Sequence, residues 1–367
     1  MNAPVFVYDP TATDEQSKVR GVGRYMQTMY EYLSPEFNFT KNIAEIPHTH
    51  IFINPFFNHL QKPLTYKKIA RRQVALIHDV IPFKYPKAFP IGIKGTLMKL
   101  LNNWTLKNYD VIVTDSEESK KGIVQILKIP PNKVRVIYAT VPHLFLPHID
   151  TSQTHHPFHK EESGTVAEFS NITESQFMTN NLKNLQDFVL YVGDATWNKN
   201  LINLAKAVQM ANVICVCVGK VFSQKDMPAK PNPWQLPLYQ FLKIAKTDKR
   251  FIFPGYVSDI DLLALYKKAK LNILPSYDEG FGLSYIEAGY LSTPSVLSNT
   301  PIFKEIANNA AIFANPNDPK DLAEKISQLF YDKLLREKLS VEAFTRAQDY
   351  NPTNFKNQWL DLISKLS

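Results

Sequence analysis

The stretch Glu279-Gly-Phe-Gly-Leu-Ser-Tyr-Ile-Glu287-Ala-Gly289 directly follows an apolar, strand-like run from Leu271 to Pro275. We expect the glycines to lead from a strand into the start of a helix. Glycine lets the backbone approach a ligand closely, and the first helical turn offers unpaired N–H groups and about half a positive charge to a phosphate. The two carboxylates can accept hydrogen bonds from hydroxyl groups. The stretch therefore predicts a site for an anionic, polyhydroxylated ligand.

The alternative is purely structural, with Glu279 and Gly280 in an ordinary loop and Glu287 as a solvated helix residue. The scarcity of glycine favours function. The chain has 12 glycines among 367 residues, fewer than the usual share of roughly 7%. Seven of them fall in four segments that each have the pattern of a strand-end loop or a helix start: Gly21, Gly23, Gly193, Gly255, Gly280, Gly282 and Gly289.

Short apolar runs alternate with amphipathic stretches along the whole chain, which predicts parallel sheets covered by helices. Two series of strands are expected. The first comprises Val5 to Tyr8, His50 to Ile53, Val74 to Ile77, Val111 to Thr114 and Val134 to Tyr138, and the second comprises Phe188 to Val192, Val213 to Val218, Phe251 to Phe253, Leu271 to Leu274 and Pro294 to Ser298.

The stretch between the two series is polar and lacks either period, so we interpret it as a linker with an insertion. Its His155-His-Pro-Phe-His159 has no carboxylate or thiolate partner at ligand spacing, and no metal is expected. The expected organisation is an N-terminal domain over 1–146, the linker over 147–184, a C-terminal domain over 185–350 and a docking helix over 351–367. Two such domains would bind ligand in the cleft between their strand ends.

Composition excludes several classes of protein. With 44% hydrophobic and 21% charged residues the chain is a globular protein. It has neither the roughly 20 apolar residues of a membrane span nor a signal peptide, so we expect a cytoplasmic protein. Cys215 and Cys217 point to one side of a strand and are expected to be reduced core residues. The net charge of +8 predicts an anionic partner, and no nucleic-acid-binding motif is present.

Two further segments offer groups to such a ligand. Lys199 follows the strand-like Val189 to Val192 and the turn at Gly193, where a phosphate would meet both a helix start and a full positive charge. A surface lysine after a routine turn is the alternative. His78-Asp79 ends the strand at Ile77, where α/β proteins present functional side chains, although a turn or cap is the more common role.

Two glycine-containing segments have the pattern of ligand-facing loops or helix starts. Gly21-Val-Gly23-Arg24 lacks the third glycine of a dinucleotide fingerprint, and we expect a flexible loop that faces phosphate or acceptor. The second segment is Gly255-Tyr-Val-Ser258-Asp259-Ile-Asp261. Its residues from Ser258 to Asp261 are expected to cap and begin a helix rather than to bind metal.

A basic amphipathic helix is predicted over residues 90–109. It carries Lys94, Lys99 and Lys107 among apolar residues and could lie on an anionic bilayer. The alternative is a helix packed on the core with its lysine face in solvent.

Taken together, these segments resemble the retaining glycosyltransferases of family 4. The most specific element is Pro275 to Ala288, which is similar to the family's E-x7-E motif, with support from the Lys199 loop, Gly255-Tyr256-Val257 and His78-Asp79. The resemblance implies an α/β chain of the GT-B fold, in which two Rossmann-like domains with parallel sheets face each other and a C-terminal helix docks back on the N-terminal domain.

The resemblance also implies a role for each residue. Glu279 would contact the donor sugar, Glu287 the ribose hydroxyls, Lys199 the leaving diphosphate, and His78 would face the sugar from the opposite domain. The remaining substrate-binding residues are expected in three groups: backbone amides of Gly280, Phe281, Gly282 and Leu283 at the sugar and diphosphate, the backbone of Tyr256 and Val257 at the base, and Gly21, Gly23 and Arg24 from across the cleft.

The resemblance therefore implies a metal-independent hexosyltransferase without a cofactor. It would use a nucleotide-sugar donor and a glycan or lipid-linked acceptor in cell-surface polysaccharide assembly. The basic helix over residues 90–109 would add contact with the inner face of an anionic membrane. Many relatives have an arginine where this chain has Asp194 or Asn198, whereas Glu305 keeps an acidic position of the family. A non-catalytic nucleotide-sugar-binding protein and a nucleotide-sugar epimerase are the alternatives.

Overall fold

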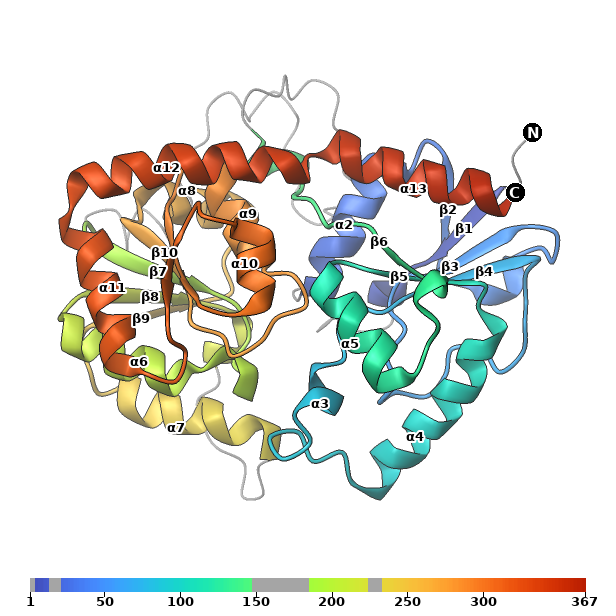
Figure 1. The fold of residues 1–367 in the computed structure, drawn as a ribbon, viewed down its shortest axis with the longest axis horizontal. Helices are drawn as coiled ribbons and strands as arrows, with labels where there is room; N and C mark the ends of the chain where they lie inside the picture. The colour runs from blue at the N-terminus through green and yellow to red at the C-terminus, as the bar shows by residue number, and fades with distance from the viewer. Residues whose placement is uncertain (1–3, 13–20, 147–184, 224–232) are drawn as a thin grey trace.

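The computed structural model describes residues 4–12, 21–146, 185–223 and 233–367. The linker predicted over 147–184, with its three histidines, lies outside the described residues. The described residues form two lobes, one for each series of strands, and the chain crosses back to the first lobe at its C-terminal end (Figure 1).

The N-terminal sheet has six parallel strands in the order β2-β1-β3-β4-β5-β6. Residues Val5 and Ile51 are paired, as are Val74 and Val111, so the apolar runs lie side by side in the sheet. The strand bounds are β1 Val5–Tyr8, β2 Phe37–Thr40, β3 Ile51–Asn54, β4 Arg72–Leu76, β5 Val111–Thr114 and β6 Val134–Val136. The helices of this half are α2 Gly21–Leu33, α3 Ile81–Lys84, α4 Gly92–Thr105 and α5 Glu117–Leu127.

The C-terminal sheet is also parallel and six-stranded, in the order β12-β11-β10-β7-β8-β9. Its strands are β7 Phe188–Val192, β8 Ile214–Val218, β9 Phe251–Gly255, β10 Leu271–Leu274, β11 Ser295–Ser298 and β12 Ile312–Ala314. Its helices are α6 Leu201–Ala211, α7 Leu236–Ala245, α8 Asp259–Lys268, α9 Leu283–Tyr290, α10 Pro301–Ala307, α11 Pro319–Tyr331 and α12 Lys333–Ala347. Cys215 and Cys217 are free and buried in β8, as predicted.

The predicted strands are all present, but the sequence prediction missed β2 and β12. These are strands of four and three residues at the two sheet edges. Both are only partly buried and have few apolar residues in a row, so their sequences lack the continuous apolar run of a central strand.

The last helix, α13 (Pro352–Leu366), leaves the C-terminal domain and packs on α2 of the N-terminal domain, which confirms the predicted docking. Asn351 caps it by accepting a hydrogen bond from the Asn354 N–H, and Pro352 occupies the first helical position. Its own side chains Trp359 and Phe355 are fully buried. Burying a large aromatic side chain removes 150–250 Å² from water, so this helix is a firm second connection between the domains.

Candidate active site

The turn from β10 to α9 requires glycine. Gly282 has a φ of +97°, and a Cβ atom there would lie 2.9 Å from the Phe303 ring. Only glycine adopts this backbone without strain. Because Gly282 is also the N-cap residue and has no side chain, no side-chain oxygen caps the helix from that position, and the first-turn N–H groups of α9 are offered to a ligand.

Glu279 lies before this turn and is held by Lys199. The Lys199 Nζ atom lies 2.8 and 2.7 Å from the two carboxylate oxygens, and the Ser276 hydroxyl donates to Oε1 at 2.6 Å. Burial alone would lower the pKa of Lys199, but the Glu279 carboxylate raises it above its ordinary value. Lys199 is therefore a fixed positive charge beside the glycine-rich turn rather than a solvated surface lysine.

The loop that carries Lys199 is bound to the loop that carries Glu279. The Asn198 side chain donates to the Asp278 carbonyl at 3.0 Å, and the Tyr277 N–H donates to the Asn198 carbonyl at 2.7 Å. Asn198 stands where many relatives of the resembled family have an arginine, and here it is buried as a link between loops. It contributes rigidity to the site instead of charge.

Glu287 lies in the second turn of α9 and is reached from the other domain. Its carboxylate lies 3.3 Å from Arg24 Nε and accepts a hydrogen bond from the Tyr266 hydroxyl at 2.9 Å. Arg24 also forms a bidentate pair with Asp259, at 2.7 and 2.8 Å. Burial raises the pKa of Glu287, and the positive charge of Arg24 opposes that shift.

The expectation of a flexible loop at Gly21, Gly23 and Arg24 is wrong. These residues form the first turn of α2, which begins at Gly21. The polar, glycine-containing pattern hid a helix start that is completed by contact with the other domain. Arg24 is committed to two carboxylates, so it cannot meet a ligand while those bonds stand.

His78 lies beyond the end of β4 and is paired with a residue that the sequence prediction missed. Its Nδ1 atom lies 2.5 Å from Asp115 Oδ2. Burial lowers the pKa of His78, but Asp115, Asp79 and a hydrogen bond to the Pro55 backbone together raise it, so the net shift is upward from 6.5. Asp115 follows β5, the neighbour of β4, and this position at the same sheet edge was the available signal.

Asp79 follows His78 and stabilises a turn, which was the alternative role considered for this dipeptide. Its carboxylate accepts a hydrogen bond from the Ile81 N–H at 2.9 Å. Burial raises its pKa.

Gly280 brings the two domains into contact. Its carbonyl accepts hydrogen bonds from the hydroxyls of Ser116 and Ser119, at 2.7 and 3.0 Å, near the start of α5. A Cβ atom at Gly280 would lie 3.0 Å from the His78 carbonyl oxygen. The glycine therefore allows the Glu279 loop to approach the strand end that carries His78.

A second contact at α5 comes from Glu305, whose carboxylate accepts from the N–H groups of Glu117 and Glu118 at 2.7 and 2.9 Å. Neither contact follows from a local pattern, because each joins residues of different domains.

The remaining predicted residues lie around this centre. Tyr256 is 58% exposed and Val257 is buried, directly after Gly255, which has a φ of +81°. Phe281 is buried against Tyr138 and Tyr350. Ser258 caps α8, as predicted, by accepting a hydrogen bond from the Asp261 N–H. Over the described parts of the chain, no group of three or more His, Cys, Asp or Glu side chains is placed to hold a metal ion.

Residues 173–346 match the family model described as glycosyl transferases group 1. The O-antigen chain mannosyltransferase RfbU of Salmonella typhimurium is 25% identical over 265 residues, which cover 71% of this chain and 62% of that protein. The O-antigen chain mannosyltransferase B of Escherichia coli is 23% identical over 301 residues, covering 80% and 71%. The match to the first of these relatives thus spans less than two thirds of its length.

Solved structures show the same fold over the whole chain. A glycosyltransferase from Rickettsia africae ESF-5 superimposes with a TM-score of 0.65 and 16% identity, covering 100% of this chain and 98% of the other. Anabaena Alr3699/HepE in complex with UDP-glucose superimposes with a TM-score of 0.69 and 13% identity, covering 99% and 100%. Identities this low speak for the fold alone, and that fold is GT-B.

Proposed function

Because residues 173–346 match the family model of the group 1 glycosyl transferases and the chain has the GT-B fold, we propose that this protein transfers a sugar from a nucleotide-sugar donor to an acceptor hydroxyl. The observation that carries the proposal is the ion pair of Lys199 and Glu279 beside the uncapped start of α9. It lies at the carboxyl ends of the strands, where open α/β sheets bind ligands.

In this proposal the positive charge acts on the leaving group. As the bond between the anomeric carbon and the diphosphate breaks, negative charge grows on the diphosphate. Lys199 and the N–H groups of residues 280–283 are fixed where they can stabilise that charge without reorganisation. No metal is needed for this role, and transfer is proposed to retain the anomeric configuration. Glu279 would then exchange part of its bond to Lys199 for hydroxyls of the sugar.

The other contacts follow from the same orientation of the donor. Glu287 would bind the ribose hydroxyls after parting from Arg24, and the backbone of Tyr256 and Val257 would receive the base. His78 would face the sugar from the N-terminal domain. Its pairing with Asp115 fixes the ring orientation, which supports a positioned side chain rather than a mobile one.

The names of the relatives support a particular sugar and a particular pathway class. Both compared sequences are named as O-antigen chain mannosyltransferases. We therefore propose mannose as the transferred sugar and a glycan or lipid-linked glycan as the acceptor, in cell-surface polysaccharide assembly on the cytoplasmic side of the membrane.

A second candidate function is a nucleotide-sugar-binding protein without turnover. It is favoured by two observations: Asp194 and Asn198 stand where many relatives of the resembled family have an arginine, and Arg24 is committed to Asp259 and Glu287. Lys199, paired with Glu279, would then have to supply most of the side-chain positive charge for the diphosphate, because the neighbouring Lys84 is paired with Asp278.

A donor screen tests the proposal. Thermal unfolding in EDTA is measured with UDP-, GDP-, ADP- and dTDP-sugars, because a ligand at 100 times its Kd adds about 2.7 kcal/mol of stability. We expect one nucleotide-mannose to stabilise the protein and to be turned over with a lipid-linked or oligosaccharide acceptor. Glu279→Gln should abolish turnover. Binding without turnover on any acceptor, unaffected by Glu279→Gln, would establish the second candidate, and no binding of any donor would refute both.

A further inference from the structure

Helix α4 presents its apolar side to solvent. The side chains that α4 buries against the protein are small or polar, namely Gly95, Asn102 and Thr105. Its large apolar residues point the other way: Ile93 is 92% exposed, Leu97 52%, Leu100 62% and Trp104 55%. The spacing of these four residues, at i, i+4, i+7 and i+11, places them in one stripe along the helix. The alternative of a helix packed on the core by its apolar side is therefore wrong.

Specific contacts fix the rotation of the helix. The Asn102 side chain donates to the Gln61 carbonyl at 2.8 Å and to the His59 carbonyl at 3.3 Å. Lys99 lies over the Phe83 ring, 4.6 Å from its centroid. Rolling the apolar stripe inward would break these bonds and bury lysine, so the exposed stripe is a property of the fold.

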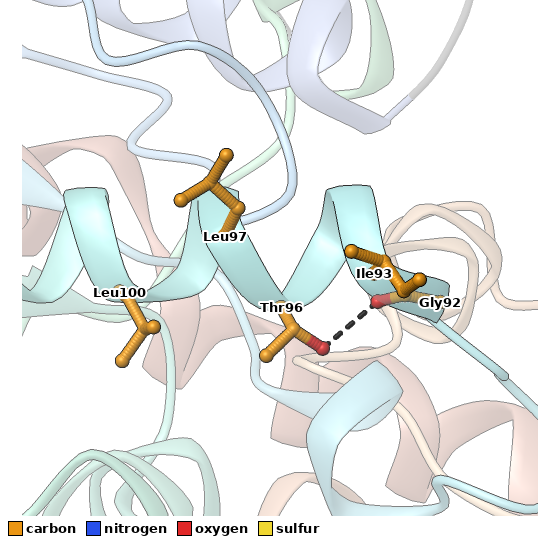
Figure 2. A pocket seen from close by; sticks show the side chains of 5 residues that line it. All are labelled: Gly92, Ile93, Thr96, Leu97 and Leu100. Carbon is orange, nitrogen blue, oxygen red and sulfur yellow. Dashed lines mark hydrogen bonds between the residues drawn. The ribbon is translucent and has the colours of Figure 1, made fainter.

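The exposed face is shaped as a shallow, open hollow. Gly92, Ile93, Thr96, Leu97 and Leu100 line it, and the Thr96 hydroxyl donates to the Gly92 carbonyl at 2.8 Å within the helix (Figure 2). The one polar side chain among them is thus already hydrogen bonded. The face offers apolar contact and no built polar recognition site.

The surrounding charge identifies the occupant. Residues 46–109 contain eight lysines and two arginines but a single acidic residue, Asp79, so this segment alone accounts for the positive balance of the chain. Exposed Lys94 and Lys107 flank the stripe at its two ends. A second copy of the chain would bring the same positive field against itself. An anionic bilayer complements both features, because its head groups attract lysine and its interface accepts apolar side chains.

We propose that α4 is an in-plane membrane-binding helix, which inserts Ile93, Leu97, Leu100 and Trp104 into the interface of an anionic bilayer. The lysines steer the approach, and the apolar stripe holds the protein in place. The sequence predicted a basic amphipathic helix with Lys94, Lys99 and Lys107 among apolar residues, and the structure adds which of its apolar side chains face outward. None of the helices that the structure describes is long and apolar enough to cross a bilayer, and this mode of binding requires no crossing.

Vesicle flotation tests the proposal on the whole chain without donor or acceptor, so its outcome is independent of the transferase proposal. Vesicles of phosphatidylglycerol and phosphatidylethanolamine are compared with vesicles of phosphatidylcholine, at low and high salt. We expect binding to the anionic vesicles that weakens but persists at high salt. The triple variant Leu97→Ser, Leu100→Ser, Trp104→Ser should bind at least tenfold more weakly.

The matched control is Leu334→Ser with Val341→Ser on α12, where the two side chains are 78% and 67% exposed. It removes exposed apolar surface from the other domain and should leave vesicle binding unchanged. All five positions are exposed, so both variants should unfold at the temperature of the wild type. Brominated lipid should quench tryptophan emission in the wild type, and much less in Trp104→Phe.

Three results would overturn the proposal. The first is a triple variant that floats like the wild type. The second is complete release of the wild type by salt without quenching of Trp104, which would show attraction by lysine alone. The third is a concentration-dependent dimer that the triple variant abolishes, which would show that a second copy covers the stripe.

Discussion

The two carboxylates of the Glu279–Glu287 segment have opposite relations to the rest of the molecule. Glu279 binds Lys199, which belongs to the same domain and lies in the loop after β7, the strand next to β10 in the sheet. Glu287 binds Arg24, which belongs to the N-terminal domain. The first ion pair joins residues of one domain, whereas the second requires the two domains to be in contact.

The two ion pairs therefore have different proposed roles: the Lys199 pair in the chemical step and the Arg24 pair in holding the domains together. The Lys199 pair lies within one domain, so it places a positive charge at the proposed donor site without any contact from the N-terminal domain. The Arg24 pair connects α2 to Asp259 and Glu287, and so it reports and stabilises the closed arrangement. If Glu287 binds the ribose, as proposed, the donor competes with Arg24 for that carboxylate. Donor binding and domain closure are then coupled through one residue.

The largest expected effect is that of replacing Lys199, the partner of Glu279. Lys199→Ala removes the fixed positive charge and should lower kcat by about 10²–10³-fold, since that is the usual cost of losing one group that stabilises transition-state charge. The control is Lys206→Ala, an exposed lysine of α6 in the same region, which should leave kcat within twofold. A Lys199→Ala enzyme with normal kcat but raised KM would instead assign Lys199 to donor binding.

Replacing Arg24, which joins the two domains, should lower the free energy of unfolding and change the shape of the molecule. Arg24→Ala removes the bidentate partner of Asp259 and the cation beside the buried Glu287 carboxylate, and breaking a buried pair in this way typically costs about 3–5 kcal/mol. Because Arg24 and Asp259 are 16% and 20% exposed, we expect about 2–3 kcal/mol by urea unfolding. Small-angle scattering should show a larger radius of gyration.

Two further variants isolate the cross-domain pair. Adding Glu287→Gln to Arg24→Ala removes the stranded charge and should restore part of the lost stability. Lys68→Ala, which breaks the exposed pair with Asp110 inside one domain, should cost less than about 1 kcal/mol. If Arg24→Ala leaves both stability and radius unchanged, the pair does not hold the domains together.

Gly280 lies between Glu279 and Glu287, at the point where this segment contacts the N-terminal domain. Gly280→Ala would place a methyl group 3.0 Å from the His78 carbonyl oxygen and 3.3 Å from Asp79 Cβ, so the loop and the strand end must separate by a few tenths of an ångström. We expect kcat/KM to fall about tenfold, because small displacements of positioned groups are costly. The melting temperature should change little. In Gly289→Ala the methyl group meets the Ala343 carbonyl at 2.9 Å inside the C-terminal domain, and there stability should fall instead.

The sequence was sufficient to select Glu279, Gly282 and Lys199 as residues around one turn, and insufficient to predict the contacts between the two domains. Glu279, Gly282 and Lys199 belong to strand–turn–helix units whose signals lie within about a dozen neighbouring residues. The pairs Arg24–Glu287 and Ser116–Gly280 join residues of different domains, and no local period or spacing encodes how two domains dock. Asp115 was within reach, since it follows a strand adjacent to the one before His78.

The two amphipathic helices show the same limit. Both α4 and α13 have an apolar stripe with a tryptophan, yet Trp359 is fully buried and Trp104 is 55% exposed. Periodicity locates the stripe of each helix and not the surface that it faces. In α4 the deciding residues are Gly95 and Asn102, whose small size and hydrogen bonds suit them to the protein side.

The smallest expected effect concerns the pH dependence of stability at His78. The pKa of His78 is raised above 6.5 in the folded protein, because Asp115, with help from Asp79 and a backbone hydrogen bond, outweighs the effect of burial. The charged pair therefore contributes its full stability below pH 6.5. That contribution is lost as pH rises through the raised pKa, at about 1.4 kcal/mol for each unit of the shift. Wild type should therefore lose stability between pH 6 and pH 9 relative to Asp115→Asn, measured by urea unfolding.

His78→Gln should remove the same slope as Asp115→Asn, and NMR titration of the His78 ring should show a lower pKa in Asp115→Asn than in the wild type. A slope that persists in both variants would place the titrating group elsewhere. The result also bears on the comparison of Glu279 with Glu287, because it decides whether positive charge near Glu279 comes from one domain or from both. His78 lies against the Gly280 loop, so a charged, Asp115-bound imidazole would mean that the N-terminal domain, too, brings positive charge to the donor site when the domains close.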